Sequence, residues 1–409
     1  MALLVQKYGG TSVGDADRIR NVARRAIAAR KQGHDVVVVV SAMSGETNRL
    51  LKLTREVARR PSEREQDVVV STGEQVTVGL LALAIQEQKA KARSFLGHQV
   101  RILTDSAFAN ARIKSIDGGR LFESLARKEI AVVAGFQGID EHGNITTLGR
   151  GGSDTTAVAL AAALKASACE IYTDVDGVYT TDPRICDRAR KLDRVAYEEM
   201  LELASLGSKV LQIRSVEFAM KYKVPLWVKS SFSDDPGTLI TEEDEAMEDV
   251  LVSGIAVTRD EARFVIRSVP DKPGLAARIF GTLAALDIVV DVIVQTPAHE
   301  DKRTDLAFTV GRLDLEKTRD CVRKLVKQIG AGKVEHEVDI AKVSIVGVGM
   351  RNHAGVAAKM FQVLADEGVN IRVISTSEIK VSCLIDEKYA ELAVRALHTA
   401  FGLDAKTAS

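Results

Sequence analysis

The chain has 409 residues, 46% of them hydrophobic and 27% charged, which is typical of a folded globular protein with more than one domain. Its 56 basic and 56 acidic residues cancel, so no net charge favours a nucleic acid or an anionic membrane as partner. The first residues lack the pattern of a signal peptide, no apolar run reaches about 18 residues, and the four cysteines form no C-x-x-C pair. We therefore expect a cytoplasmic protein with reduced thiols.

From residue 1 to about 240, short β-branched runs alternate with longer helical patterns. This alternation predicts an α/β domain with an open, mostly parallel sheet sandwiched by helices. Val68–Val70 has strand propensity, but its continuation to Ala84 favours a long helix. The expected strands are Leu3–Gln6, Val36–Ser41, Val100–Leu103, Ala131–Ala134, Glu170–Thr173 and Leu226–Lys229, and the expected helices include Ala16–Lys31, Thr77–Glu87 and Asp154–Lys165.

A glycine-rich turn follows the first expected strand and contains Lys7, Tyr8, Gly9 and Gly10. Glycines let a backbone approach a ligand closely, and the free N–H groups of a helix start attract anions. A lysine ammonium beside nucleotide phosphates would neutralise the charge that develops during phosphoryl transfer. The alternative is a solvated lysine at a strand end before a tight turn.

A second glycine-rich turn, Gly149–Asp154, precedes another helical pattern. Arg150 can bind a carboxylate through two charge-assisted hydrogen bonds, and Asp154 can pair with an ammonium. The alternative is an ordinary loop with a helix N-cap. Together, the two turns indicate a nucleotide phosphate site and an amino-acid site in one domain.

Further polar segments follow other expected strands, where open α/β sheets bind ligands. Ser41–Asn48 is one of them, and Ser71–Glu74 lies beyond it, although either segment could be an ordinary loop or helix cap. Tyr172–Arg184 would suit a ribose or an adenine. Lys209 is either a helix-surface lysine or a second phosphate ligand.

Known nucleotide and metal motifs are absent from the sequence. The chain has no G-x-x-x-x-G-K-[ST] loop, so a nucleotide would be held by another fold. Asp174–Gly177 is similar to the start of a calcium loop but lacks the later ligands. We therefore expect no metal site built from protein side chains alone.

The last third of the chain contains an internal repeat. Gly274–Phe280 matches Gly355–Phe361 at an offset of 81 residues, with expected strands before and after each copy. A polar, acidic stretch, Ser233–Glu245, separates the repeats from the first domain. We expect three domains, at residues 1–245, 246–335 and 336–409, the last two being β-α-β-β-type units.

The order of these motifs, from K-Y-G-G-T-S (residues 7–12) through S-A-M-S-G-x-T-N, S-T-G-E, G-F-Q-G and T-L-G-R-G-G-S-D (147–154) to D-P-R (182–184), resembles the aspartate kinases of the amino-acid-kinase superfamily. The repeats resemble α+β, ferredoxin-like ACT domains. The resemblance implies transfer of the ATP γ-phosphoryl group to the side-chain carboxylate of L-aspartate, giving 4-phospho-L-aspartate, with Mg²⁺ on the phosphates. It also implies a place at the start of lysine, threonine, methionine and diaminopimelate biosynthesis.

The resemblance also assigns roles to residues. The catalytic group is Lys7, Arg150 and Asp154. The aspartate site comprises Ser41, Thr47, Glu74, Arg150, Gly151, Gly152, Ser153 and Asp154. The ATP site comprises Lys7, Tyr8, Gly9, Gly10, Ser41, Thr173, Asp174, Tyr179, Thr180, Thr181, Asp182, Pro183, Arg184 and Lys209.

The ACT resemblance implies feedback inhibition by lysine, by threonine, or by both, and a homo-oligomer, dimer or tetramer, formed through these domains. The effector contacts it implies are Asp271, Gly274, Ala276, Asp291 and Gln295 in the first copy, and Val356, Ala357, Asn370, Ile371, Ser377 and Glu378 in the second. Ala354 stands where the family pattern has a proline, so the second effector turn is expected to be less rigid.

Two other functions are compatible with the motifs. One is a related kinase acting on glutamate, acetylglutamate or a nucleotide, because one methylene in a pocket changes binding by only about 1–3 kcal/mol. The other is an amino-acid sensor without catalysis. The sequence also leaves open an internal start at Met247.

Overall fold

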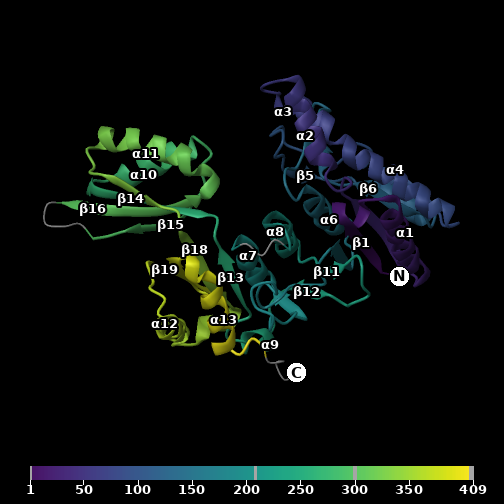
Figure 1. Cartoon of the computed structure of the whole chain (residues 1–409). Helices are drawn as coiled ribbons and strands as arrows, with labels where there is room; N and C mark the ends of the chain where they lie inside the picture. Colours follow the sequence, from purple (N-terminus) through teal and green to yellow (C-terminus); the bar gives the residue numbers. More distant parts are fainter. Residues whose placement is uncertain (1, 207–209, 298–301, 405–409) are drawn as a thin grey trace. The chain divides into compact units, whose positions relative to one another are not determined.

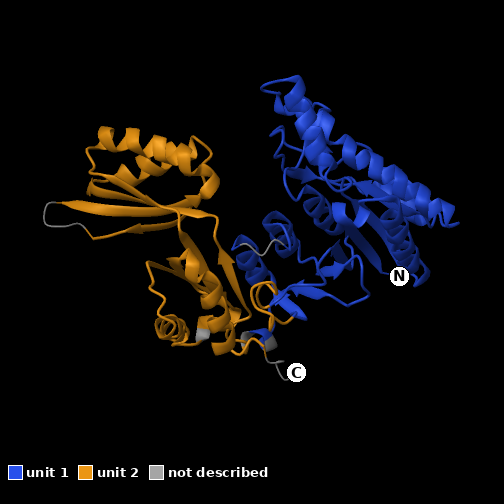
Figure 2. Ribbon diagram, viewed as in Figure 1, with its two compact units in different colours: residues 1–179, 191–248 blue, residues 180–190, 249–409 orange. Residues whose placement is uncertain are grey.

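The computed structural model describes residues 2–206, 210–297 and 302–404. It forms two compact units, one made of residues 1–179 and 191–248 and the other of residues 180–190 and 249–409 (Figure 2). Each unit has its own sheets and its own core.

The first unit is built on an eight-stranded sheet in the order β10-β12-β11-β9-β1-β2-β6-β3 (Figure 1). Every neighbouring pair is parallel except β11 with β12, which confirms the expected mostly parallel α/β fold. The strands are β1 (Leu3–Tyr8), β2 (Asp35–Val40), β3 (Ala92–Phe95), β6 (Ile130–Ala134), β9 (Ala168–Thr173), β10 (Arg194–Ala196), β11 (Leu226–Ser230) and β12 (Thr238–Thr241).

The carboxyl ends of the parallel strands meet at one edge of this sheet. The residues that follow β6, β2, β1, β9 and β11 are Gly135, Ser41, Gly9, Asp174 and Ser231. Open α/β sheets bind their ligands at this edge, so the fold brings the polar segments found in the sequence to one place.

Helices cover both faces of the sheet. On one face, α1 (Ala16–Lys31) and α4 (Thr72–Glu87) share a core with Tyr8 and with alternate residues of β2 and β6. Helix α6 (Gly152–Ala163) contacts β1, β2 and β9 from the other face. The remaining segments of the unit are η1 (Gly10–Val13), α2 (Glu46–Val57), α3 (Glu63–Val70), α5 (Gly119–Ala126), α7 (Tyr197–Ser205), α8 (Ile213–Tyr222) and α9 (Glu245–Glu248).

The segment expected as a strand at Val100–Leu103 is different in the structure, and this prediction was wrong. Val100 lies in a turn, although it is buried, and the central sheet instead takes β3. Burial in a turn gave the same apolar pattern as a strand. Only Leu103 belongs to a strand, in a small second sheet of β5 (Ile113–Ser115), β4 (Leu103–Thr104), β7 (Gln137–Ile139) and β8 (Ile145–Thr147).

Val68–Val70 is helical, as expected, but the structure has two helices there, α3 and α4, which meet at Ser71. Together, Glu63–Glu87 is long and apolar enough to span a membrane by length and composition, with half of the apolar window buried. Val78, Leu81 and Ile85 of α4 lie in the core against α1 and the sheet. The helix therefore has the contacts of a core helix.

The second unit contains two four-stranded sheets, β15-β16-β14-β17 and β13-β18-β20-β19. Each forms an α+β layer with two helices, α10 and α11 on the first and α12 and α13 on the second (Figure 1). The elements are β13 (Gly254–Thr258), β14 (Glu261–Pro270), α10 (Leu275–Ala284), β15 (Val290–Gln295), β16 (Arg303–Gly311), η2 (Arg312–Asp314), α11 (Leu315–Ile329), β17 (Val334–Glu337), β18 (Ile340–Val346), η3 (Val348–Asn352), α12 (Val356–Asp366), β19 (Val373–Ser377), β20 (Lys380–Asp386), η4 (Glu387–Tyr389) and α13 (Ala390–Ala400).

Two segments lie apart from the contiguous domains expected at 1–245, 246–335 and 336–409. Strand β13 precedes the first repeat but pairs with β18, so it occupies the sheet position in the second repeat that β17 occupies in the first. Residues 180–190 belong to the second unit, where Ile185 packs on the core of the second repeat. Composition could not show that these two segments leave their expected domains, because their positions depend on strand pairing and packing between segments far apart in the sequence.

Candidate active site

Lys7 and Asp154 form an ion pair in the first unit, with 2.5 Å between Lys7 Nζ and Asp154 Oδ1. Strand alternation turns Lys7 away from the core that contains Tyr8 and toward the face that α6 covers, and Asp154 lies in the first turn of α6. The two side chains are only 10% and 11% exposed. The first glycine-rich turn and the second therefore converge on one buried pair of charges.

The Asp154 carboxylate depends on this ion pair. Its Oδ1 is buried and accepts no hydrogen bond within the described residues, so the Lys7 ammonium supplies its balancing charge. The first turn of a helix also favours an anion. The pair places a cation at the carboxyl end of β1, where a ligand anion would meet it.

Glycines let the surrounding turns approach each other. A Cβ on Gly10 would lie 2.9 Å from Ala42 O, and one on Gly135 would lie 2.8 Å from Ser153 Oγ. Gly151, the N-cap of α6, has a φ of 74°, where only glycine is unstrained. These contacts hold the ends of β1, β2 and β6 against the start of α6.

We expect Gly135→Ala to lower turnover at least roughly tenfold, because the new methyl group pushes Ser153, and with it the first turn of α6, away from β6. Gly79→Ala is the matched control. Gly79 lies within α4 with no atom near the added methyl group, so this change should raise the free energy of unfolding by about 0.5–1 kcal/mol. Steady-state kinetics and urea unfolding of both variants check this, and equal activity in the two would contradict the packing argument.

Glu74 lies in the first turn of α4 and is buried. Its Oε1 accepts a hydrogen bond from the Ala42 N–H at 2.9 Å, while its Oε2 is buried without a partner among the described residues. Burial raises the pKa of Glu74 to about 7, although the Ala42 N–H opposes the shift. An unpartnered oxygen in this position can bind a donor group of a ligand.

Glu74 should make stability depend on pH. Because the pKa rises from 4.5 to about 7 on folding, the native state holds a proton that the unfolded state releases. The contribution of the protonated Glu74 carboxyl to the free energy of unfolding is fully present below pH 4.5. The free energy of unfolding then falls by about 3 kcal/mol as the pH rises through 7. In urea unfolding between pH 5 and 8, Glu74→Gln should flatten the dependence of the free energy of unfolding on pH. The control, Glu87→Gln at the exposed end of α4, should leave this dependence unchanged. An unchanged slope in Glu74→Gln would count against the buried carboxyl.

Three other residues of the expected aspartate site, Ser41, Thr47 and Arg150, are more exposed to solvent than Glu74 and Asp154. Thr47 is half-buried in the first turn of α2, and Ser41 follows β2 directly. Arg150 is exposed on the loop before α6, and it has no ion pair or hydrogen bond within the described residues. Its guanidinium is therefore available for a carboxylate.

The residues expected to bind the nucleotide divide between the two units. Thr173, Asp174 and Tyr179 belong to the first, where the Tyr179 hydroxyl donates to Asp176 at 2.9 Å. Burial, with the Asp176 carboxylate, raises the pKa of Tyr179 to about 12. Lys209 lies outside the described residues.

Thr180–Arg184 lies in the second unit. Thr180 Oγ1 is 2.9 Å from His398 Nε2 on α13 and accepts from the Arg190 N–H. Arg184 pairs with Asp182 at 2.8 Å, and Thr181 is buried. This segment is therefore fixed to the second repeat by its own contacts.

Sequence reasoning missed Asp67 and Arg214. Asp67, in α3, accepts hydrogen bonds from Ala109 N–H, Thr147 N–H and Thr147 Oγ1 at 2.7–3.1 Å. Arg214, in α8, donates to Leu148 O at 2.6 Å and to Ala111 O at 2.9 Å. Both residues hold the segment that leads into the second glycine-rich turn. Asp67 ends a polar, charged run before Val68–Val70, a pattern that is common on helix surfaces, so the sequence contains no clear signal for its buried position.

The expected effector contacts of the first repeat lie on the turn after β14, in the first turn of α10 and on β15. Asp271, Gly274 and Ala276 are exposed, and so are Asp291 and Gln295 on the edge strand. In the second repeat, Val356 is buried at the start of α12, Ala357 and Ile371 are half-buried, and Asn370, Ser377 and Glu378 are exposed. In each set, residues at a strand-to-helix turn and the start of its helix are joined by residues on the edge strand, and the second set also includes the loop before β19.

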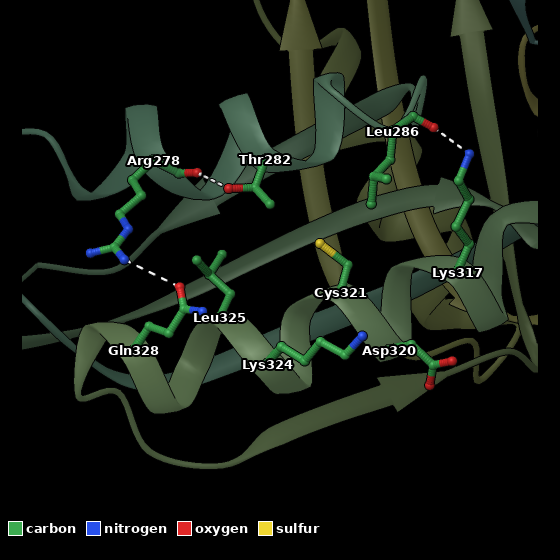
Figure 3. A pocket seen from close by; sticks show the side chains of 9 residues that line it. All are labelled: Arg278, Thr282, Leu286, Lys317, Asp320, Cys321, Lys324, Leu325 and Gln328. Atoms are coloured by element: carbon green, nitrogen blue, oxygen red, sulfur yellow. Dashed lines mark hydrogen bonds between the residues drawn. The ribbon is translucent and has the colours of Figure 1, made fainter.

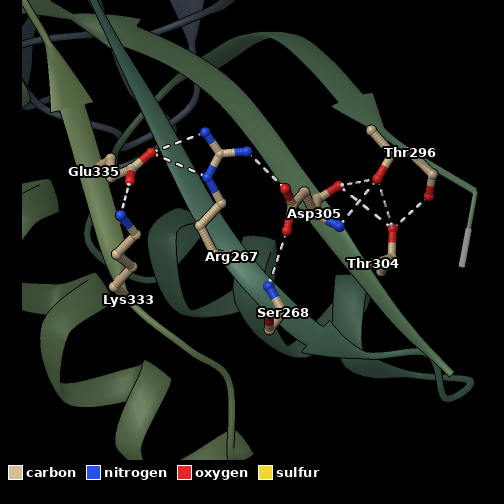
Figure 4. Close-up of polar contacts among 7 residues, drawn as sticks. All are labelled: Arg267, Ser268, Thr296, Thr304, Asp305, Lys333 and Glu335. Carbon is tan, nitrogen blue, oxygen red and sulfur yellow. Dashed lines mark hydrogen bonds and ion pairs between the residues drawn. The ribbon is translucent and has the colours of Figure 1, made fainter. Parts of the chain in front are cut away.

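A polar network fixes the end of β14 before the first of these turns (Figure 4). Arg267 donates to Asp305 at 2.6 Å and to Glu335 at 3.0 Å, and Asp305 also accepts from the Ser268 N–H at 2.9 Å. Ser268 has a φ of 52° at a bulge in the β14–β16 ladder. The network holds this bulge, which directs the chain into Asp271.

A cavity of about 410 Å³ lies between α10 and α11 on the first repeat (Figure 3). It contains no residue of the candidate active site, which belongs to the first unit. Arg278 closes part of one end by donating to Gln328 at 3.2 Å. The other lining side chains are those of Thr282, Leu286, Lys317, Asp320, Cys321, Lys324 and Leu325.

Comparisons with known proteins agree with this division of the chain. Residues 2–230 match the amino acid kinase family, and residues 264–327 and 343–401 match ACT domains. An aspartate kinase of Pseudomonas putida is 60% identical over 406 residues, covering 99% of this chain and 98% of that protein. An aspartokinase of Pseudomonas aeruginosa is 60% identical over 407 residues, with the same coverage.

Solved structures give the same result. A crystal structure of E. coli aspartokinase III in complex with aspartate and ADP has a TM-score of 0.80 and 27% identity, covering 97% of this chain and 99% of that one. The same enzyme in complex with lysine and aspartate has a TM-score of 0.79 and 28% identity, covering 98% and 99%.

The fold and the buried Lys7–Asp154 pair define an ATP-dependent kinase of the amino acid kinase class with ACT domains. Within this class, the chain belongs to the aspartate kinase family.

Proposed function

We propose that the protein transfers the γ-phosphoryl group of ATP to the side-chain carboxylate of L-aspartate and releases 4-phospho-L-aspartate and ADP. The Lys7–Asp154 pair at the carboxyl edge of the sheet carries this proposal, because it joins the phosphate turn to the amino-acid turn. The aspartate and ADP bound to the E. coli relative support it. The product would enter lysine, threonine, methionine and diaminopimelate biosynthesis in the cytoplasm.

In this reaction, the residues supply charge and alignment. A carboxylate is already a nucleophile at neutral pH, so no strong base is needed. The Lys7 ammonium would stabilise the negative charge of the transferring group, and Asp154 would hold this ammonium in place. ATP would enter as its Mg²⁺ complex, whose ion neutralises part of the phosphate charge.

The remaining roles are proposed on the same geometry. Arg150, whose guanidinium pairs with none of the residues that the structure describes, would bind a carboxylate of aspartate, beside Ser41, Thr47, Glu74 and the start of α6 at Gly151–Ser153. The phosphates would lie over the turn of Tyr8, Gly9 and Gly10. Thr173, Asp174 and Tyr179, with residues 180–184 and Lys209, are the proposed nucleoside contacts.

A hydroxylamine-trapping assay tests the reaction. Purified protein with Mg²⁺, ATP and L-aspartate should form aspartyl hydroxamate and equimolar ADP. L-Glutamate, N-acetyl-L-glutamate and UMP are the comparison acceptors, with ADP release as the common readout. Turnover with one of these and none with aspartate would overturn the proposal.

We also propose feedback inhibition through the second unit, by lysine, by threonine, or by both. The lysine bound to the E. coli relative and the two ACT domains support this regulation. No strand of the described residues pairs with the outer sides of the edge strands β15 and β19, and their backbone groups favour pairing between copies in a dimer or tetramer. Inhibition assays with each amino acid and with both together test the effector.

A further inference from the structure

Lys342 of the second repeat lies between two carboxylates of the first. Its ammonium forms ion pairs with Glu261 on β14 and with Asp291 on β15. The side chains of Lys342 and Glu261 are only 6% and 9% exposed, whereas that of Asp291 is 55% exposed. One ammonium therefore serves a buried carboxylate and an open one.

The cluster of Lys342, Glu261 and Asp291 has one positive and two negative charges, so its net charge is −1. Neither Glu261 nor Asp291 has a second cationic partner within the described residues, and Glu261 Oε2 is buried without a hydrogen-bond partner. Burial lowers the pKa of Lys342, but the Glu261 and Asp291 carboxylates outweigh it and leave this pKa above its ordinary value. A cluster with charge −1 at a partly open position attracts a cation.

We propose that Lys342 is an internal competitor for the ammonium group of an amino-acid effector. The effector ammonium binds Asp291, and Lys342 then pairs with Glu261 alone. The four charges balance in this bound state. The inference deepens the proposed regulation and rests on it, since Asp291 is a candidate effector contact.

The exchange would also couple the two repeats. The Lys342–Asp291 ion pair joins β18 of the second repeat to β15 of the first. An effector whose ammonium binds Asp291 therefore breaks one ion pair between the two repeats. Other ion pairs between the repeats, such as Arg372–Glu337 at 3.0 Å, would remain. Lys342 is therefore a positioning residue that sets both effector affinity and the strength of this link.

Two variants should change effector affinity in opposite directions. Glu261→Gln leaves Lys342 with Asp291 as its only carboxylate, so the internal pair strengthens and the effector binds roughly tenfold more weakly. Glu261→Gln/Lys342→Met removes the competitor and leaves no buried charge unpaired, so the effector binds roughly tenfold more tightly than to the unaltered chain. Lys388→Met, an exposed lysine of the same repeat, is the control and should change nothing.

The test is calorimetric titration of the full chain with L-lysine, with L-threonine and with both, after thermal unfolding has shown that each variant is folded. A purely structural Lys342 would give weaker binding in both variants, and this result would overturn the inference. Absence of binding of either amino acid to the unaltered chain would overturn it as well. Hydroxamate formation in the same samples is a separate readout, so failure of the proposed kinase reaction is recognised independently.

Discussion

Lys7→Met is expected to lower kcat by roughly 10³-fold and to change the KM for aspartate less than about threefold. The Lys7 side chain is only 10% exposed near the carboxyl end of β1, where a low dielectric strengthens the effect of its ammonium on a charge that develops in the transition state. In the transition state the transferring phosphoryl group spreads its negative charge over its equatorial oxygens, and an ammonium fixed beside that group stabilises this charge. Steady-state kinetics with ATP and aspartate varied in turn measure both constants.

The control for this variant is Lys52→Met in α2. The Lys52 side chain is 79% exposed, so its loss should leave kcat within about twofold. A Lys7→Met enzyme with unchanged kcat and a raised KM would mean that Lys7 binds substrate only, which contradicts the transition-state role.

Asp67→Ala should lower the free energy of unfolding by about 3 kcal/mol, the largest stability effect expected in the first unit. Asp67 is only 1% exposed, and its carboxylate is the acceptor for the N–H groups of Ala109 and Thr147 and for the Thr147 hydroxyl. Burial raises its pKa, and these donors oppose the shift. Its removal leaves the buried Thr147 N–H without an acceptor.

Urea unfolding followed by circular dichroism measures this loss, with Asp17→Ala as the control. Asp17 pairs with Arg20 on α1, but its side chain is 93% exposed, so we expect a change of less than about 1 kcal/mol. If both variants unfold at the same urea concentration, Asp67 does not hold α3 to β8 as the contacts indicate.

Most of the fold of the first unit could be predicted from local patterns. Helix α1 begins and ends at the predicted residues, since an Asp15 cap and a regular apolar stripe mark it in the sequence. Strands β2 and β6 are almost wholly β-branched or apolar, and β1, β9 and β11 have mainly apolar or β-branched residues with one or two charged or polar ones, as in a buried parallel sheet. Val100 shows the limit of such patterns, because a buried turn and a strand have the same composition.

The sites could be predicted only in part. Glycine and charge patterns located Lys7 and Asp154, but their direct ion pair depends on α6 covering the face of β1 that bears Lys7. The pairing of β13 with β18 spans the whole first repeat, and the contact of Lys342 with Asp291 joins strands of different repeats. No local pattern encodes such contacts, which arise from the packing of complete sheets.

The most direct test of the central claim is a double-mutant cycle on kcat with Lys7→Met, Asp154→Asn and the double variant. If Lys7 and Asp154 act on one reacting centre, the double variant should be about as slow as Lys7→Met alone, since Asp154 acts through Lys7. If the two losses multiply instead, the residues act independently, and the two glycine-rich turns do not serve a single site.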